Sequence, residues 1–143
     1  QEKGFMEIMN ENGIKTLREV GNYNYNDAYA ATVRLVDRPN PADSIFCSND
    51  IMAIGAMDAV RSGMNMKVPE DISIIGFDDI PMASWPSFNL TTVRQPVQRM
   101  VDGSVEDLIS RINTPEKPPN HKLIMGELVI RGSSRISTEV SKL

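Results

Sequence analysis

Short apolar segments alternate with helical segments along the first half of the chain, and this alternation limits the possible folds more than any other feature. The apolar segments cover residues 16–20, 44–48 and 72–76. Between them, apolar residues recur at helical spacing over residues 27–36 and 51–60, and proline or glycine follows shortly after each. Strands separated by helices of this length are typical of βαβ units. The sequence therefore predicts an α/β domain with a parallel sheet covered by helices on both faces.

The remaining segments have a different pattern. Residues 1–12 have helical spacing, and residues 80–89 form an irregular stretch that contains two prolines and the only tryptophan. A β-rich segment follows at Leu90–Val93. Pro96 then opens a long helix whose apolar residues share one face. After a Pro-rich loop, residues 122–131 are expected to form a last strand.

Composition excludes several classes of function. The chain has 143 residues, enough for one domain with a sizeable core, and 15 basic against 19 acidic side chains give a net charge of −4. This charge is opposite to that of domains that grip nucleic acid, so we expect no DNA binding by this chain alone. The single cysteine, Cys47, excludes an intrachain disulfide and a cysteine-based zinc site. No segment has the pattern of a membrane span or a signal peptide, so we expect no membrane contact.

The residue types present give little support to an enzyme. His121 is the only histidine and lies far along the chain from the predicted strand ends, so a nucleophilic triad lacks its base. Cys47 lies in an apolar segment beside no basic residue, as is typical of a packing residue. Asp50 and Asp78 could form the acid/base pair of a glycosidase, but the sequence does not give their separation. We expect a protein that is not an enzyme and that needs no cofactor and no metal.

Polar residues follow the three predicted strands, at the ends where ligands bind in an open parallel sheet. These ends carry Asn22-Tyr23, Asn49-Asp50 and Asp78-Asp79. Each pair alone can be a turn or a helix cap, because Asx side chains bond readily to nearby backbone. Together they predict one polar rim that bonds to ligand hydroxyls, with the ring of Tyr23 stacked on an apolar ligand face. A sugar or a nucleoside is the expected ligand, since no glycine-rich phosphate loop is present.

The helix predicted over residues 51–60 is apolar nearly all round. One side of such a helix packs on the sheet. The other side either packs against a second subunit or is buried within a larger monomer, and the sequence leaves both possibilities open.

Four segments resemble the effector-binding domain of LacI/GalR-family transcriptional regulators: residues 48–56, 68–79, 90–96 and 130–134. The resemblance covers nearly the whole chain in order. It implies the type I periplasmic-binding-protein-like fold, a three-layer α/β/α arrangement in which two similar lobes hold the ligand in a cleft and are joined by three crossovers. This chain resembles mainly the distal, C-terminal lobe.

The resemblance also implies a division of the chain and a set of partners. Residues 1–89 would belong to the distal lobe, residues 90–121 would be a crossover and a helix of the DNA-proximal lobe, and residues 122–143 would be the return strand and the C-terminal tail. Such regulators are cytoplasmic homodimers that contact operator DNA through an N-terminal helix-turn-helix, which is absent from this chain. A sugar-binding protein of a periplasmic transport system has the same fold and is the alternative.

Residue roles carried over from the family complete these expectations. The effector would be contacted by Tyr23, Asn49, Asp50, Asp78, Gln95 and Gln1, and the dimer surface would include Ile54, Met57, Trp85 and Pro86. The family usually has a ligand-contacting arginine three residues before its first helix glycine, and here Gln1 stands there. The lobe that the long helix would pack against is absent, so we expect its apolar stripe to pack on another copy or back onto its own lobe.

Overall fold

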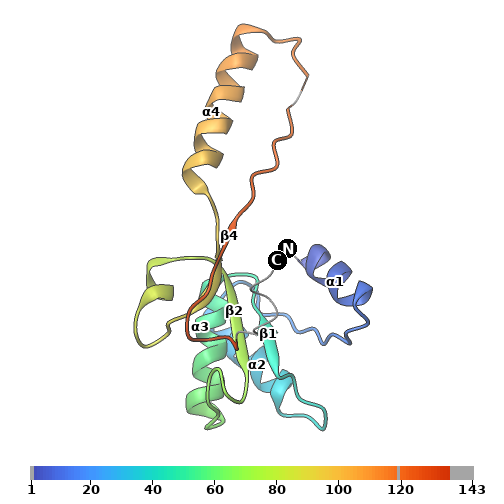
Figure 1. Cartoon of the computed structure of the whole chain (residues 1–143), viewed down its shortest axis with the longest axis vertical. Coiled ribbons are helices and arrows are strands. Elements are labelled where there is room, and N and C mark those ends of the chain that lie inside the picture. Colours follow the sequence, from blue (N-terminus) through green and yellow to red (C-terminus); the bar gives the residue numbers. More distant parts are fainter. Residues whose placement is uncertain (1, 119, 136–143) are drawn as a thin grey trace.

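A computed structural model describes residues 2–118 and 120–135. Its elements, in chain order, are α1 (Glu2–Glu11), α2 (Tyr25–Val36), β1 (Ser44–Phe46), α3 (Asp50–Asp58), the π-helix η1 (Ala59–Gly63), β2 (Ser73–Asp78), the 3-10 helix η2 (Pro81–Ser84), β3 (Thr91–Arg94), α4 (Val97–Asn113) and β4 (Glu127–Val129). Figure 1 shows the strands and the first three helices in one body, with α4 standing away from it. The predicted α/β class is confirmed.

The sheet has the order β1-β2-β3-β4. β1 and β3 both pair with β2 in parallel, with Ile45 opposite Ile74 and Gly76 opposite Thr92. β4 pairs with β3 in the antiparallel direction, with Glu127 opposite Arg94, and is much shorter than the strand expected over residues 122–131. The sheet is therefore predominantly parallel, and the returning strand is its antiparallel edge.

The strand expected over residues 16–20 is not formed. This segment is irregular, and its residues Leu17 and Val20 line a hollow of about 830 Å³ together with β1. A strand is stable only when its backbone groups pair with a neighbour. The alternation of apolar residues is present here, but among the described residues no backbone hydrogen bond joins this segment to β1, so the prediction was wrong.

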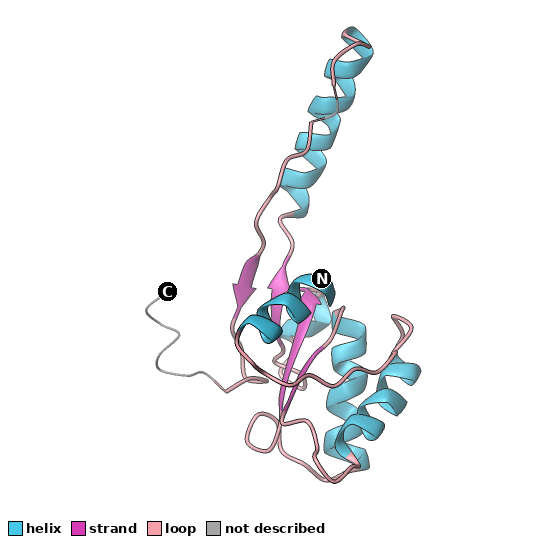
Figure 2. Ribbon diagram, turned by 90° about the vertical axis from the view of Figure 1, so that its right-hand side faces the viewer, coloured by secondary structure: helices cyan, strands magenta, loops and turns pink. Residues whose placement is uncertain are grey.

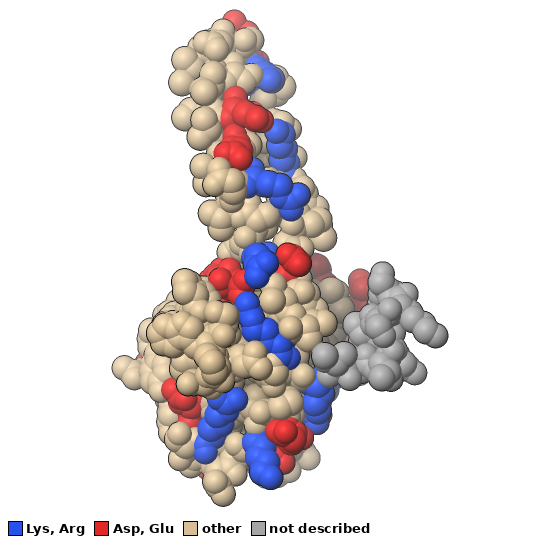
Figure 3. All heavy atoms as spheres, turned by 60° about the vertical axis from the view of Figure 1, so that its left-hand side comes forward, with Lys and Arg blue, Asp and Glu red and all other residues tan. Residues whose placement is uncertain are grey.

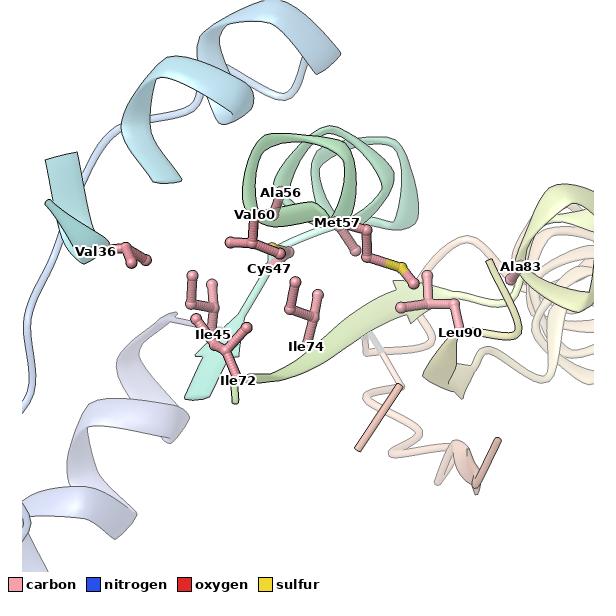
Figure 4. Packing of buried hydrophobic residues seen from close by; sticks show 11 residues of the cluster. Val36, Ile45, Cys47, Ala56, Met57, Val60, Ile72, Ile74, Ala83 and Leu90 are labelled. Atoms are coloured by element: carbon pink, nitrogen blue, oxygen red, sulfur yellow. The ribbon is translucent and has the colours of Figure 1, made fainter. Parts of the chain in front are cut away.

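α3 lies between the sheet and α2, which explains why it is apolar all round. Figure 4 shows Met57 and Val60 facing the buried side chains of Ile74 and Leu90 on the sheet side. On the opposite side Gly55 lies against α2, where an added Cβ would come within 2.5 Å of the carbonyl oxygen of Tyr25. The second side of this helix is thus covered within the chain.

This burial corrects the expected dimer surface. Ile54 and Met57 are both buried, and they therefore present no face to a second subunit. Burial of an apolar helix inside a domain and burial in a dimer produce the same sequence pattern, and here α2 supplies the cover.

α1 covers the other face of the sheet. Ile45 of β1 points toward α3, so the next residue, Phe46, points to the opposite face. There its ring stacks on that of Phe5 of α1, with 5.2 Å between ring centroids and 12° between planes. Helices on both faces give the expected three-layer arrangement.

α4 projects away from the sheet in both views, and two chain segments connect it to the body (Figures 1 and 2). None of its residues is buried, and its apolar stripe is exposed at Val97, Met100, Val101, Val105, Leu108, Ile109 and Ile112. The stripe does not fold back onto the lobe, contrary to one of the two expectations. Among residues 2–118 and 120–135, no helix combines the length and apolarity that a membrane span requires.

Candidate functional site

The candidate site lies where the strands β1 and β2 end. The backbone N–H of Cys47 donates to the carbonyl oxygen of Ile75 over 2.8 Å, which continues the pairing of the two strands beyond β1. The segment 48–49 therefore runs beside the end of β2 at residues 76–78. We call Tyr23, Asn49, Asp78 and Gln95 the polar rim.

Tyr23 is held in a turn that exposes its ring. Asn22 and Tyr23 both have left-handed backbone, with φ of 47° and 56°, and the side chain of Tyr23 is 71% exposed. The turn is fixed by the Nδ2 groups of Asn22 and Asn24, which donate to Asp27 Oδ2 over 2.8 and 2.9 Å and lower the pKa of that carboxyl. Tyr23 and Ser48 line a hollow of about 470 Å³ together with residues of α1. The ring is thus available to a flat ligand face.

Asn49 caps α3. Its Oδ1 accepts a hydrogen bond from the backbone N–H of Met52 over 2.8 Å, and the residue is half-buried. Such a cap satisfies one of the unpaired N–H groups of the first helical turn. The cap fixes the position of the side chain at the rim.

Asp50 does not belong to the rim. It is fully buried, Oδ1 accepts from the hydroxyl of Thr92 over 2.6 Å, and Oδ2 accepts from the N–H of Ile80 over 2.9 Å. Burial raises the pKa of this carboxyl, the two hydrogen bonds oppose that shift, and the charges of Asp78 and Asp79 reinforce it. The expected ligand contact is thus contradicted: both oxygens are used inside the protein. The same burial removes Asp50 from any acid/base pair with Asp78.

Asp78 and Gln95 form the centre of the rim. Gln95 Nε2 donates to Asp78 Oδ1 over 2.6 Å, and both residues are half-buried. Asp78 ends β2 and Gln95 follows β3, so the contact joins a strand end to the segment that leads into α4. The structure thus brings together two side chains that the sequence placed 17 residues apart.

A second carboxylate beside Asp78 holds two arginines, and sequence reasoning missed this cluster. Arg94 Nε donates to Asp79 Oδ2 over 2.6 Å, and Arg131 Nη2 donates to Asp79 Oδ1 over 2.7 Å. Burial alone would raise the pKa of Asp79, but the arginines outweigh it and hold that pKa below its ordinary value. The signal was present, because Arg131 stands within the family motif at residues 130–134, but the motif gives it no partner.

Other expected residues are placed as follows. Trp85 is 51% exposed and Pro86 is also exposed, on the loop after η2. Gln1 lies outside the described residues. Cys47 is buried, and burial raises the pKa of its thiol to about 12, as suits a packing residue. Within the described part of the chain, no three His, Cys, Asp or Glu side chains gather in a way that could hold a metal ion.

A predominantly parallel sheet with helices on both faces, polar side chains at its strand ends and two strands leading away defines one lobe of a periplasmic-binding-protein-like domain. Residues 1–134 match the family described as periplasmic binding protein-like domain. The probable HTH-type transcriptional repressor ExuR of Bacillus subtilis is 36% identical over 138 residues, which are 94% of this chain and 41% of ExuR.

Solved structures agree with this match. The transcriptional regulator CelR in complex with cellobiose superposes with a TM-score of 0.82 and 27% identity, over 92% of this chain and 41% of that one. A LacI-family regulator from Arthrobacter sp. in complex with lactose superposes with a TM-score of 0.80 and 27% identity, over 93% of this chain and 50% of that one. The chain therefore belongs to the periplasmic binding protein-like domain family, in the form found in LacI-family regulators. It spans less than half of ExuR, and these relatives are regulators, not enzymes.

Proposed function

We propose that this chain is the effector-sensing part of a LacI-family transcriptional repressor whose ligand is a small sugar or a nucleoside-like molecule. The contact between Asp78 and Gln95 carries the proposal, because it joins an acceptor at the strand end to the segment that leads into α4. A ligand hydroxyl that bonds to Asp78 competes with Gln95 and so acts on that segment. Two similar regulators are complexes with cellobiose and with lactose, which supports a sugar over other polyols.

Each rim residue has a proposed part in ligand binding. Asp78 accepts hydrogen bonds from ligand hydroxyls, and Tyr23 stacks on the apolar face of the ring. Asn49 bonds to a further hydroxyl through its amide, while Gln95 exchanges its bond to Asp78 for a bond to the ligand. Gln1 would occupy the place of the family's arginine, with an amide in place of a charge.

The exposed stripe of α4 supports the proposed division of the chain. Residues 1–89 form the distal lobe, residues 90–121 cross to the DNA-proximal lobe, and residues 122–143 return. Burying a large apolar side chain contributes about 1.5–3 kcal/mol, so the seven exposed apolar residues of this helix favour a cover by the second lobe.

The proposed assembly is a cytoplasmic homodimer that uses the loop with Trp85 and Pro86 as part of its subunit contact. It binds operator DNA through a helix-turn-helix module outside this chain. The ligand favours one relative orientation of the two lobes, and this differential affinity changes operator binding, by a coupling of about 1–3 kcal/mol in typical cases.

The test is direct binding to the full-length protein. Calorimetry with cellobiose, lactose, ribose and adenosine is expected to give saturable binding for at least one compound, and the same compound should change the affinity for operator fragments selected from genomic DNA. Binding without any change in operator affinity would contradict the regulatory part of the proposal. Turnover of the bound sugar would contradict it in favour of an enzyme.

A further inference from the structure

The pair of strands β3 and β4 is the link between the sheet and α4. β3 leads directly into α4, and the chain returns from α4 into β4, which pairs with β3 at Arg94 and Glu127. Figures 1 and 2 show that, in the described part of the chain, these two segments join the projecting helix to the body. Any movement of α4 relative to the sheet must therefore act through this pair of strands.

Asp79 forms hydrogen bonds with a side chain of β3 and with a side chain that follows β4. Its two carboxylate oxygens accept from different arginines: Oδ2 from Arg94 at the end of β3, and Oδ1 from Arg131, which follows β4. Arg131 also donates through Nη1 to the carbonyl oxygen of Leu90, just before β3, over 2.8 Å. The side chains of Asp79 and Arg131 are only 8% and 14% exposed. One side chain at the end of β2 thus cross-ties the outgoing and the returning strand.

Charged side chains of opposite sign alternate at the junction of β3 and β4, and their attraction opposes movement of one strand along the other. Glu127 of β4 lies 3.6 Å from Arg94, so two arginines and two carboxylates alternate across the pair of strands. Side chains of both signs gather where the α4 segment meets the body in Figure 3. Of these four side chains only Asp79 and Arg131 are largely buried, and a charge-assisted bond in such a place is stronger than an exposed ion pair. Removing Asp79 leaves the guanidinium of Arg131 without its carboxylate, while Arg94 and Glu127 remain exposed to water.

Asp79 directly follows the rim residue Asp78 in the chain. Asp78 and Asp79 have left-handed backbone, with φ of 118° and 58°, which non-glycine residues rarely adopt unless their surroundings enforce it. Their side chains have separate tasks: Asp78 contacts Gln95, and Asp79 holds the two arginines. One peptide unit therefore separates the rim residue Asp78 from the residue that holds the two strands.

We propose that Asp79 is a positioning residue that couples the effector acceptor Asp78 to the orientation of the β3–β4 pair, and through it to α4. This inference rests on the proposed function, because the coupling has a purpose only if an effector binds at the rim. Asp79 itself does not touch the effector. Its loss should uncouple effector binding from operator binding while effector binding persists.

The test compares Asp79→Asn with wild type in the full-length protein. The asparagine keeps the shape but accepts from one arginine only, without charge. In typical allosteric proteins an effector changes the affinity for the second ligand, here operator DNA, about 5- to 150-fold. In Asp79→Asn we expect the effector to change operator affinity by less than about twofold. The dissociation constant of the effector should change less than about threefold. A purely structural role would weaken both quantities together and would lower the thermal midpoint.

Two further variants keep the test decisive. Arg94→Gln removes one bond at an exposed arginine and leaves the pair between Asp79 and Arg131, so it should fold and lose part of the coupling. Glu19→Gln is the matched control, because Glu19 accepts from Arg34 over 2.8 Å in an ion pair that involves neither the rim nor the junction. It should behave as wild type. Wild-type coupling in both Asp79→Asn and Arg94→Gln would overturn the proposal.

Hydrogen exchange separates this proposal from the proposed function. In Asp79→Asn the amides of residues 91–94 and 127–131 should exchange more than about tenfold faster, while those of β1 keep their protection. This readout needs no effector. If no compound changes operator binding by the wild type, the proposed function fails, and the exchange data still decide whether Asp79 holds the two strands. Uniform loss of protection across the sheet would show a general structural role and overturn the proposal.

Discussion

The hydroxyl of Thr92 donates a hydrogen bond to Asp50 over 2.6 Å, and this contact joins two residues 42 positions apart. Asp50 stands in the first turn of α3, where the helix dipole favours a negative charge, and Thr92 is in the middle of β3. The second oxygen of Asp50 accepts from the N–H of Ile80. One buried carboxylate thus sets the position of α3 against both the loop after β2 and the strand that leads out of the sheet.

Two substitutions of this carboxylate should destabilise the protein by different amounts. Asp50→Ala leaves the hydroxyl of Thr92 and the N–H of Ile80 buried without a partner, so we expect a loss of at least about 2 kcal/mol in the free energy of unfolding. Asp50→Asn keeps an acceptor for the N–H of Ile80, and its amide N–H can donate to the hydroxyl oxygen of Thr92, which reverses the direction of that bond. It also removes a carboxyl group whose pKa is raised by burial. It should cost less than about 1 kcal/mol at pH 7. Urea unfolding measures both, and equal losses would contradict the assignment.

Gly76 provides the space that this carboxylate occupies. A Cβ added at residue 76 would overlap Oδ1 of Asp50 and would lie 3.0 Å from Cδ2 of Leu90. We therefore expect Gly76→Ala to destabilise the protein by about 3 kcal/mol or more, as overpacking does in a dense core. Gly4→Ala is the matched control, because nothing lies within 4 Å of a Cβ there. Gly4 lies in the first turn of α1, where alanine should stabilise the protein by up to about 1 kcal/mol. Similar unfolding curves for the two variants would show that residue 76 has room to spare.

The elements that the sequence predicted well are those whose signals are local. α3 begins at Asp50 because Asn49 caps it, and the cap, the apolar run and the following glycine all lie within 15 residues. The first turn of α2 shows the limit of this kind of inference. Helical spacing was recognised over residues 27–36, but the structure begins α2 at Tyr25 and caps it with Asn24, whose Oδ1 accepts from the N–H of Asp27. Either Asx residue can form such a cap, and the surrounding turn decides which one does.

Features set by distant partners were not predictable from the sequence. Asp50 and Asp78 look alike as acidic residues at strand ends, yet Thr92 and Ile80 draw Asp50 inward and leave Asp78 at the rim. Asp79 and Arg131 are 52 residues apart, and their contact depends on β4 pairing with β3 in the antiparallel direction. Residues 16–20 failed as a strand for the same reason, because a ladder depends on the position of its neighbour.

Substitutions at the polar rim should weaken effector binding to different extents. In the full-length protein, Asp78→Ala should abolish the response to the effector, because ligand hydroxyls lose their acceptor, at about 1–3 kcal/mol or more. Tyr23→Ala should weaken effector binding less, by the lost stacking of an exposed ring, about 1 kcal/mol. Calorimetric titration ranks the two variants. An unchanged effector affinity in Asp78→Ala would make Asp78 a structural partner of Gln95 only.

Acidification should reduce the contribution of the ion pairs of Asp79 to the free energy of unfolding. The arginines lower the pKa of this carboxyl in the folded state, so its contribution to stability is complete above the unfolded value of about 3.9 and is lost as the pH falls through the lower folded value. Asp79→Asn lacks this contribution at every pH. The difference in free energy of unfolding between wild type and variant should therefore shrink between about pH 4 and pH 2. A constant difference over that range would show that the charge of Asp79 contributes nothing.

Cys47 offers a reporter for unfolding of the whole domain. It is the only cysteine, it is buried between β1 and α3, and burial raises the pKa of its thiol to about 12. Because the thiolate is the reactive form, iodoacetamide at pH 8 should label the native protein at least about a hundredfold more slowly than an ordinary thiol. The matched control combines Cys47→Ala with Ser48→Cys, which moves the thiol one residue along the chain, to a half-buried position that lines the same hollow as Tyr23. This control should react readily in the native state, and both proteins should react equally in urea. Native labelling of Cys47 at the rate of the control would mean that β1 and α3 separate without global unfolding.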